Sequence, residues 1–351
     1  MAMQHTTNGI SMFKDQDFLA HTLANPENLK GDEKEMFAFQ SGYASYQGSG
    51  ILCLEPNQPV ANISLVLSAG IHGNETGPIE LLNELVMDIL SGKVSLGIRL
   101  LCIIGNPKAA LIAERFCEVN LNRLFGGAWQ QQQGYEAQRA EHLEACVNAF
   151  FEDEKGRDAK RLHYDLHTAI RDSVHEKFAV HPYVPNGRYQ QQQLAFLAAC
   201  DVEAVLFSHQ ATTTFSYYTF AHHAAQAFTL ELGKVRAFGD NDPANLARLR
   251  SCLLQLMVSG ELRQEDVDKL KLFQVVTALI KDAQDYRLNI TDDVANFTAF
   301  RQGFCLAESS LGHYHIEQQD DAIVFPNTKL PIGQRAGLVV RSQLKEYFSI
   351  E

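Results

Sequence analysis

Short β-rich runs alternate with helical patterns from residue 60 to about residue 262, and this order restricts the chain to few folds. Strands that alternate with helices form a mostly parallel or mixed sheet with helices on both faces. Such a sheet binds ligands at the carboxyl ends of its strands. The predicted strands are VANISLVLSAG (60–70), IRLLCIIG (98–105), LHYDLHTA (162–169), KFAVHP (177–182), EAVLF (203–207) and FTLELG (228–233).

A helix is predicted for residues 78–91, where apolar residues recur at spacings of three and four. Pro78 stands in its first turn, where the N–H that proline lacks would have no helical partner in any case. Similar patterns predict helices at roughly 134–152, 190–200 and 242–258. Together with the strands, these helices predict the α/β fold class.

The character of the chain changes after about residue 265. Four short β-rich stretches follow, separated by Asp, Asn, Gly and Pro: FQVVTALIK, YRLNIT, AIVFPN and AGLVV. A chain of 351 residues is also longer than one typical hydrophobic core. We therefore predict two domains, a larger one over residues 1–262 that includes an N-terminal extension, and a smaller β-rich one over residues 263–351.

Charge and cysteine content argue against several classes of protein. Asp and Glu number 42 against 30 Lys and Arg, and this excess of negative charge repels nucleic acid. The seven cysteines include no CxxC pair and are odd in number, which indicates free thiols in a reducing compartment. The sequence has no run of about 18 apolar residues and no secretory signal pattern. We expect a cytoplasmic protein that does not enter the membrane and that binds a small molecule.

A candidate metal-binding turn follows the first predicted strand, which runs directly into IHGNE (71–75). A spacing of three lets His72 and Glu75 converge on one point if the turn is helical. An HxxE pair alone is a weak signal in a chain with 13 histidines. Its position between a buried strand and a helix makes it a stronger one, because ligands gather there.

The segment HYDLH (163–167) can supply a third ligand. Catalytic zinc commonly takes three protein ligands of the His and Glu type and keeps one position open. Alternation along a strand places His163, Asp165 and His167 on one face. His167 is nearest the carboxyl end and is the predicted ligand, with Asp165 as a supporting carboxylate. The alternative, a metal site made by these three residues alone, is less favourable because such residues are spaced by roughly 6–7 Å per step.

Several segments together resemble the carboxypeptidase-like zinc hydrolases of the succinylglutamate desuccinylase and aspartoacylase family. They are AGIHGNETGP (69–78), GNPKA (105–109), NLNRLF (120–125), YDLHTA (164–169) and FTLELG (228–233), in the order of that family. VFPN (324–327) and GQRAGLVV (333–340) look like the C-terminal domain of its succinylglutamate desuccinylase branch. The resemblance implies a carboxypeptidase-like mixed sheet flanked by helices, followed by a smaller β-rich C-terminal domain.

The resemblance also implies one zinc ion per chain on His72, Glu75 and His167, with Glu231 as the general base and acid. A carboxylate beside a metal-activated water can take its proton and pass it to the leaving amine. Glu231 lies in the apolar strand FTLELG, where a buried charge is costly unless it has a partner or a task. The alternative is a buried structural glutamate in a salt bridge.

Three further site residues follow from the resemblance. Arg115 is expected to polarise the substrate carbonyl, because attack on an amide builds negative charge on that oxygen. Asn122 and Arg123 are expected to bind a substrate carboxylate, and the planar fork of arginine suits this task. Without the resemblance, either arginine would more often be a surface residue.

The activity implied by the resemblance is hydrolysis of N2-succinyl-L-glutamate to succinate and L-glutamate, the last step of arginine catabolism by the succinyltransferase route. The stretch ATTTFSYYTF (211–220) has hydroxyls where an aspartoacylase would have a further arginine and tyrosine. A Thr-rich strand or turn is the simplest interpretation of that stretch. Two alternatives stay open, another N-acyl-amino-acid amidohydrolase on the same scaffold and a non-catalytic metal-binding protein.

Overall fold

The computed structural model of the chain describes residues 17–29 and 35–351. This part is built around a mixed 13-stranded sheet with helices on both faces, so the predicted fold class is confirmed. In spatial order the strands are β1 (Glu35–Phe39), β2 (Gly42–Tyr46), β3 (Ile51–Pro56), β5 (Arg99–Ile104), β4 (Ile63–Ala69), β6 (Lys160–Ala169), β10 (Gln226–Lys234), β7 (Lys177–His181), β9 (Ala204–Phe207), β11 (Lys271–Ile280), β17 (Arg335–Gln343), β16 (Ala322–Val324) and β13 (Thr298–Ala299).

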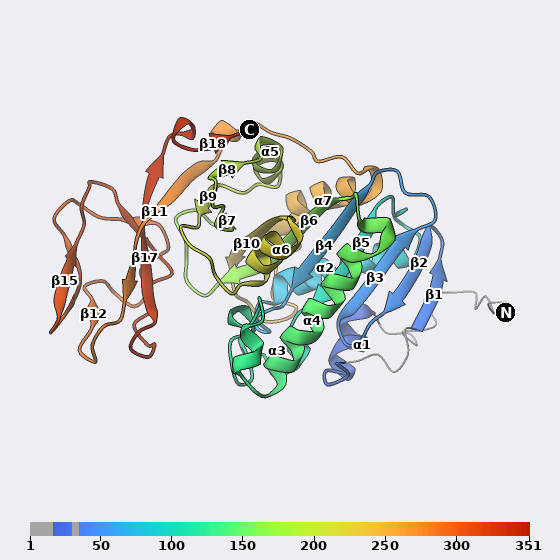
Figure 1. Cartoon of the computed structure of the whole chain (residues 1–351), viewed down its shortest axis with the longest axis horizontal. Coiled ribbons are helices and arrows are strands. Elements are labelled where there is room, and N and C mark those ends of the chain that lie inside the picture. Colours follow the sequence, from blue (N-terminus) through green and yellow to red (C-terminus); the bar gives the residue numbers. More distant parts are fainter. Residues whose placement is uncertain (1–16, 30–34) are drawn as a thin grey trace.

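Helices cover both faces of this sheet, with α4 and α6 in front of it and α2 and α7 behind it in Figure 1. No helix in the described ranges is long and apolar enough to cross a membrane. The helices are α1 (Phe18–Ala24), α2 (Thr76–Leu90), α3 (Pro107–Leu111), α4 (Tyr135–Glu152), α5 (Gln191–Ala199), α6 (Phe215–His223) and α7 (Ala247–Ser259).

Strand β4 is an interior strand of the sheet and is buried along its whole length. It pairs in parallel with β5 on one side and with β6 on the other. Leu65 and Leu67 pack into the core that contains α2, whereas Val66 packs into the core that contains α4. Because both faces of β4 are covered, its sequence is mostly apolar instead of alternating, and its two serines are buried as well.

Four predicted helices are confirmed as α2, α4, α5 and α7, with ends that differ by a few residues. The prediction of a strand or turn for 211–220 is wrong, because α6 begins at Phe215. The Oγ1 of Thr214 accepts a hydrogen bond from the backbone N–H of Tyr217 and caps this helix. A threonine hydroxyl can start a helix by accepting a hydrogen bond from an N–H of its first turn, so a Thr-rich stretch can precede a helix. Strands β1 to β3 were not predicted.

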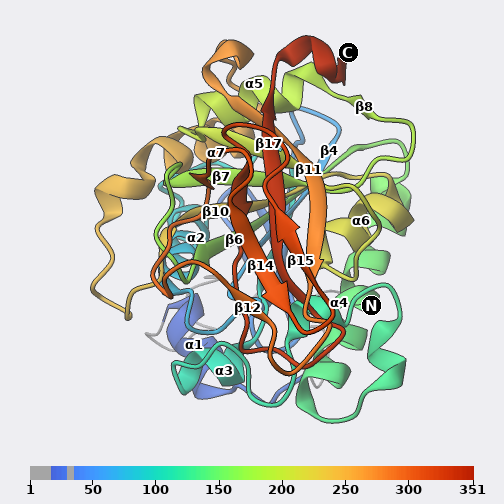
Figure 2. The same cartoon turned by 90° about the vertical axis from the view of Figure 1, so that its left-hand side faces the viewer.

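The main sheet continues into the C-terminal part of the chain. The first four residues of β11 pair in parallel with β9. The other edge of β11 pairs with β17 as an antiparallel ribbon from Leu272 to Ile280. Figure 2 shows β11 and β17 side by side across the front of the molecule. The boundary between residues 1–262 and 263–351 stays a prediction. The remaining strands are β12 (Arg287–Leu288), β14 (Cys305–Ser309) and β15 (Gly312–His315), and the pair β8 (Arg188–Tyr189) and β18 (Ser349–Ile350).

The buried position of β4 generates a stability prediction. Leu67→Ala removes a fully buried side chain from β4 and is expected to lower the free energy of unfolding by about 2–5 kcal/mol. Urea denaturation followed by circular dichroism measures this change. Leu311→Ala is the matched control, because Leu311 is 73% exposed and its truncation is expected to change stability by less than about 0.5 kcal/mol. Equal effects of the two variants would contradict the assigned core.

Candidate active site

The turn between β4 and α2 brings His72 and Glu75 to the carboxyl end of the sheet. Glu75 is the residue directly before α2, and His72 lies three positions earlier. Gly73 allows the turn to pack against the start of α3, because a Cβ on it would lie 2.2 Å from the backbone carbonyl carbon of Ala109. A side chain at this position would push the turn away from α3.

The three predicted metal ligands lie together. Among the described residues, His72, Glu75 and His167 form a group whose ligand atoms are all within 4.8 Å of one another. The Nδ1 of His72 is 2.9 Å from Glu75 Oε1, and the Nδ1 of His167 is 2.9 Å from Glu75 Oε2. All three side chains are buried. The group is a candidate metal centre, and its role as a zinc site stays a prediction.

Two hydrogen bonds outside this cluster determine which imidazole nitrogens carry protons. The Nε2 of His167 is 2.9 Å from a carboxylate oxygen of Asp165, so this nitrogen carries a proton that it donates. The Nε2 of His72 is 3.0 Å from the Oδ1 of Asn120, which also accepts from the backbone N–H of Asn122 and is therefore an acceptor. Each ring thus has its Nδ1 facing Glu75.

The electrostatics of the cluster follow from burial and from these partners. Burial, chiefly, lowers the pKa of His72 to about 4, so its ring is neutral at pH 7. Burial alone would raise the pKa of Glu75, but His72 and His167 hold it well below its usual value. Burial would lower the pKa of His167, yet Asp165 and Glu75 outweigh it and raise that pKa well above its usual value. A neutral His72 then faces Glu75 with a lone pair, which is favourable only with a cation between them.

The alternative metal triad of His163, Asp165 and His167 is not formed. His163 Nδ1 is 2.8 Å from the Oγ1 of Thr219 on α6, and its Nε2 is 2.8 Å from the Oγ of Ser68. Ser68 also donates to Asp165, at 2.6 Å. His163 therefore belongs to a buried hydrogen-bond network that supports Asp165, which in turn orients His167.

Glu231 stands beside His167 in the sheet. The two residues are paired in the parallel register of β10 and β6, so their side chains leave the same face. The Oε2 of Glu231 is buried and has no hydrogen-bond partner among the described residues, which argues against the structural salt bridge considered above. Burial, and then the charge of Glu75, raise the pKa of Glu231 to about 7. A buried carboxyl with such a pKa can exchange a proton near neutral pH.

The three remaining predicted residues surround the cluster unequally. Arg115 reaches it directly, since its Nη1 donates to Glu75 Oε1 at 2.8 Å. Asn122 is buried, and its Oδ1 accepts from the backbone N–H of Phe215 at the start of α6. Arg123 donates to the backbone carbonyl of Asn122 and has no carboxylate partner in the described part of the chain. Within the Asn122 side chain, the Oδ1 is occupied by the bond from the N–H of Phe215, and the amide nitrogen is left for a substrate carboxylate.

Asn120 and Arg335 were missed by the sequence reasoning. Both lie inside segments that carried the family resemblance, NLNRLF and GQRAGLVV, and that was the signal available for them. Burial, and then the nearby charges of Arg335 and Arg115, lower the pKa of Arg123 to about 10. The guanidinium groups of Arg115 and Arg335 therefore both lie near that of Arg123. We call Arg115, Arg123 and Arg335 the arginine group.

The fold and this site define a class of protein, the carboxypeptidase-like amide hydrolases. Residues 61–257 match the family described as the Succinylglutamate desuccinylase/Aspartoacylase catalytic domain, and residues 268–343 match the AstE/AspA barrel-sandwich hybrid domain. The chain belongs to the succinylglutamate desuccinylase/aspartoacylase family.

Similar proteins with curated names are succinylglutamate desuccinylases. Those of Shewanella piezotolerans and Shewanella pealeana are each 42% identical over 335 residues, covering 93% of this chain and 96% of theirs. Among solved structures, the succinylglutamate desuccinylase of Chromobacterium violaceum is 36% identical with a TM-score of 0.82, covering 93% of this chain and 98% of that one. The Vibrio parahaemolyticus protein is 31% identical with a TM-score of 0.82, covering 93% and 95%.

The bond between Asn120 and His72 generates a second prediction. Asn120→Ala removes the acceptor that fixes the proton on His72 Nε2, and it is expected to weaken zinc affinity by about 10- to 100-fold. Competition with a chromophoric chelator measures this affinity. Asn120→Asp keeps an acceptor oxygen and is expected to stay close to the unchanged protein, as is Asn245→Ala, which truncates an exposed asparagine. Unchanged affinity in Asn120→Ala would remove Asn120 from the site.

Proposed function

We propose that this chain is a zinc-dependent amidohydrolase that converts N2-succinyl-L-glutamate to succinate and L-glutamate, the last step of arginine catabolism by the succinyltransferase route. One observation carries the proposal: the carboxyl of Glu231, whose buried Oε2 has no hydrogen-bond partner among the described residues, stands beside His167 of the His72, Glu75 and His167 cluster. The likeness to succinylglutamate desuccinylases over nearly the whole chain supports the choice of substrate.

The donor set of the cluster supports zinc. Two imidazole nitrogens and one carboxylate are the ligands that catalytic zinc commonly takes, at about 2 Å each, so two ligand atoms of one ion lie at most about 4 Å apart. The Nδ1 atoms of His72 and His167 are each 2.9 Å from a carboxylate oxygen of Glu75, which is within this limit. The opposed lone pairs of His72 Nδ1 and Glu75 Oε1 also favour a cation at this position. When bound, zinc supplies Lewis acidity that polarises a carbonyl and lowers the pKa of water.

Glu231 is the proposed proton carrier. With a pKa of about 7 it is partly ionised at neutral pH, so it can take a proton from the attacking water. The protonated carboxyl can then return the proton to the departing glutamate nitrogen. Arg115 already reaches Glu75 Oε1 and is proposed to donate to the carbonyl oxygen as negative charge develops on it.

Arg123 and Arg335 of the arginine group are proposed to bind carboxylates of the substrate. N2-succinyl-L-glutamate carries three carboxylates that are ionised near neutral pH. Arg123 and Arg335 have no carboxylate partner among the described residues, and the mutual repulsion of the guanidinium groups is relieved when an anion enters. Asn122 is proposed to orient one of these carboxylates beside Arg123.

We further propose that residues 1–262 form the catalytic domain and residues 263–351 a β-rich domain, a division supported by the separate family matches to residues 61–257 and 268–343. The cytoplasm is the proposed location, because all seven cysteines are free and such thiols persist in a reducing compartment.

An assay of free glutamate released from N2-succinyl-L-glutamate tests the proposed function. Hydrolysis is expected to exceed that of N-acetyl-L-aspartate and of a dipeptide, to be lost on chelation and to return with added zinc. Faster zinc-dependent hydrolysis of a comparator would agree with the proposed mechanism and would contradict the proposed substrate. Absence of zinc-dependent hydrolysis of all three compounds would favour a non-catalytic metal-binding protein.

The role of Glu231 generates a separate prediction. Glu231→Gln is expected to lower kcat by about 100- to 10,000-fold, because the amide cannot accept the proton of water. Zinc content, measured by atomic absorption, is expected to stay unchanged. Glu141→Gln is the control, since Glu141 is exposed on α4. A near-normal rate in Glu231→Gln would show that another group is the base.

The pH dependence of the unchanged enzyme provides a further test of Glu231. Burial raises the pKa of Glu231 to about 7, and only the ionised form can act as a base. Activity is therefore expected above this pKa and is lost as the pH falls through it. Since a bound dication lowers the pKa of a nearby carboxyl, the midpoint of the acid limb of kcat/KM is expected at or below pH 7. The residual activity of Glu231→Gln is expected to lack this limb.

A further inference from the structure

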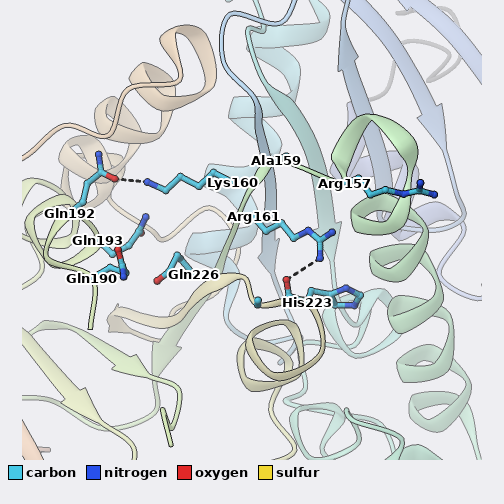
Figure 3. A pocket seen from close by; sticks show the side chains of 10 residues that line it. Arg157, Ala159, Lys160, Arg161, Gln190, Gln192, Gln193, His223 and Gln226 are labelled. Carbon is cyan, nitrogen blue, oxygen red and sulfur yellow. Dashed lines mark hydrogen bonds between the residues drawn. The ribbon is translucent and has the colours of Figure 1, made fainter. Parts of the chain in front are cut away.

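A polar cavity of about 480 Å³ lies at the amino-terminal ends of β6 and β10, away from the candidate active site at their carboxyl ends. Figure 3 shows its lining, in which α5 faces the first residues of the two strands. No residue of the candidate active site is among those that line it: Arg157, Ala159, Lys160, Arg161, Gln190, Gln192, Gln193, His223, Ala224 and Gln226. The cavity is therefore separate from the candidate active site.

The lining carries positive charge and includes no carboxylate among the described residues. Lys160 has no carboxylate partner among the described residues, and burial lowers its pKa. In the described part of the chain, its ammonium group donates to the side-chain oxygen of Gln192 and to no other group. Arg161 and His223 are partly neutralised, since Glu152 lies 3.9 Å and 3.6 Å from them. In a chain with 12 excess negative charges, such a lining favours an anion.

Gln193 adds a buried donor that has no acceptor. Only 1% of the residue is exposed, and its Oε1 accepts a hydrogen bond of 2.7 Å from the hydroxyl of Tyr164. This bond fixes the orientation of the amide and leaves Nε2 without a partner in the described part of the chain. Figure 3 shows the side chain turned toward the space between Lys160 and Gln226. Buried polar groups are nearly always bonded, so this donor indicates a missing acceptor.

The amino terminus of α5 lies at the same cavity. Gln190 precedes this nine-residue helix, and no side chain caps it. In this first turn, the N–H of Gln191 donates to the carbonyl of Glu351 and that of Gln193 to the carbonyl of Gln190, whereas the N–H of Gln192 has no backbone partner in the described part of the chain. This N–H and the partial positive charge of a helix amino terminus favour an anion. Gln190, Gln192 and Gln193, which surround this turn, all line the cavity. The helix terminus and the unpartnered amide thus point to one kind of ligand.

We propose that this cavity binds a small oxyanion, a carboxylate or phosphate group, through Lys160, Gln193 and the amino terminus of α5. The oxyanion has the acceptors that these donors lack, and it balances the charge of Lys160. The site is independent of the proposed reaction, because it shares no residue with the arginine group or the metal cluster.

Isothermal titration of the zinc-loaded full chain with inorganic phosphate, and separately with succinate, tests this site. Lys160→Met is expected to weaken the affinity of the cavity for the preferred anion by about 10- to 100-fold, because a charged donor is lost. Gln193→Leu is expected to weaken it as well. Lys329→Met is the matched control, since this lysine is 83% exposed and lies in another part of the chain.

Binding at the candidate active site is separated from binding at the cavity by Arg123→Met. Heat that persists in Arg123→Met and disappears in Lys160→Met supports the cavity site, and the tighter of the two anions identifies its preferred group. Heat that disappears in Arg123→Met and persists in Lys160→Met overturns the proposal, as does the absence of binding by both anions. Neither result affects the proposed hydrolysis, which is measured by glutamate release.

Discussion

Two hydrogen bonds from outside the cluster of His72, Glu75 and His167 determine whether this cluster favours a bound cation. Asp165 and Asn120 each accept from the Nε2 of one imidazole, so His167 and His72 both turn Nδ1 toward Glu75. With His72 neutral, an acceptor nitrogen then lies 2.9 Å from an acceptor oxygen. That contact is unfavourable unless a cation lies nearby. The outer partners therefore favour metal binding before any ligand distance is considered.

The packing of the sheet sustains this arrangement. Alternation along β6 sends His163, Asp165 and His167 to one face and the apolar Tyr164 and Leu166 to the other, where both are buried in the core that contains α2. One strand thus supplies a metal-ligand candidate, its orienting carboxylate and part of the hydrophobic core. Glu231 follows the same logic, because the register of β10 puts it beside His167.

Local patterns in the sequence were sufficient for much of this picture. The apolar run of β4, the spacing of His72 and Glu75 and the position of His167 near a strand end are features of short segments, and such features can be predicted without knowing the fold. The partner of Asn120 and the approach of Arg335 to Arg123 depend on residues distant in sequence. The pairing of β11 with β9 is of the same kind, since no local pattern encodes which strands become neighbours.

That pairing has a mechanical consequence. Because β9 and β11 share a ladder of backbone hydrogen bonds at Lys271 to Gln274, the C-terminal part is attached to the main sheet along a strand edge instead of by a flexible linker. A hinged opening of the two parts would have to break this ladder, which costs far more than rotating a few loop residues. We therefore expect substrate entry and product release to depend on movements of loops and side chains, because Arg335 at the start of β17 is joined through β11 to the same sheet as His167 and Glu231.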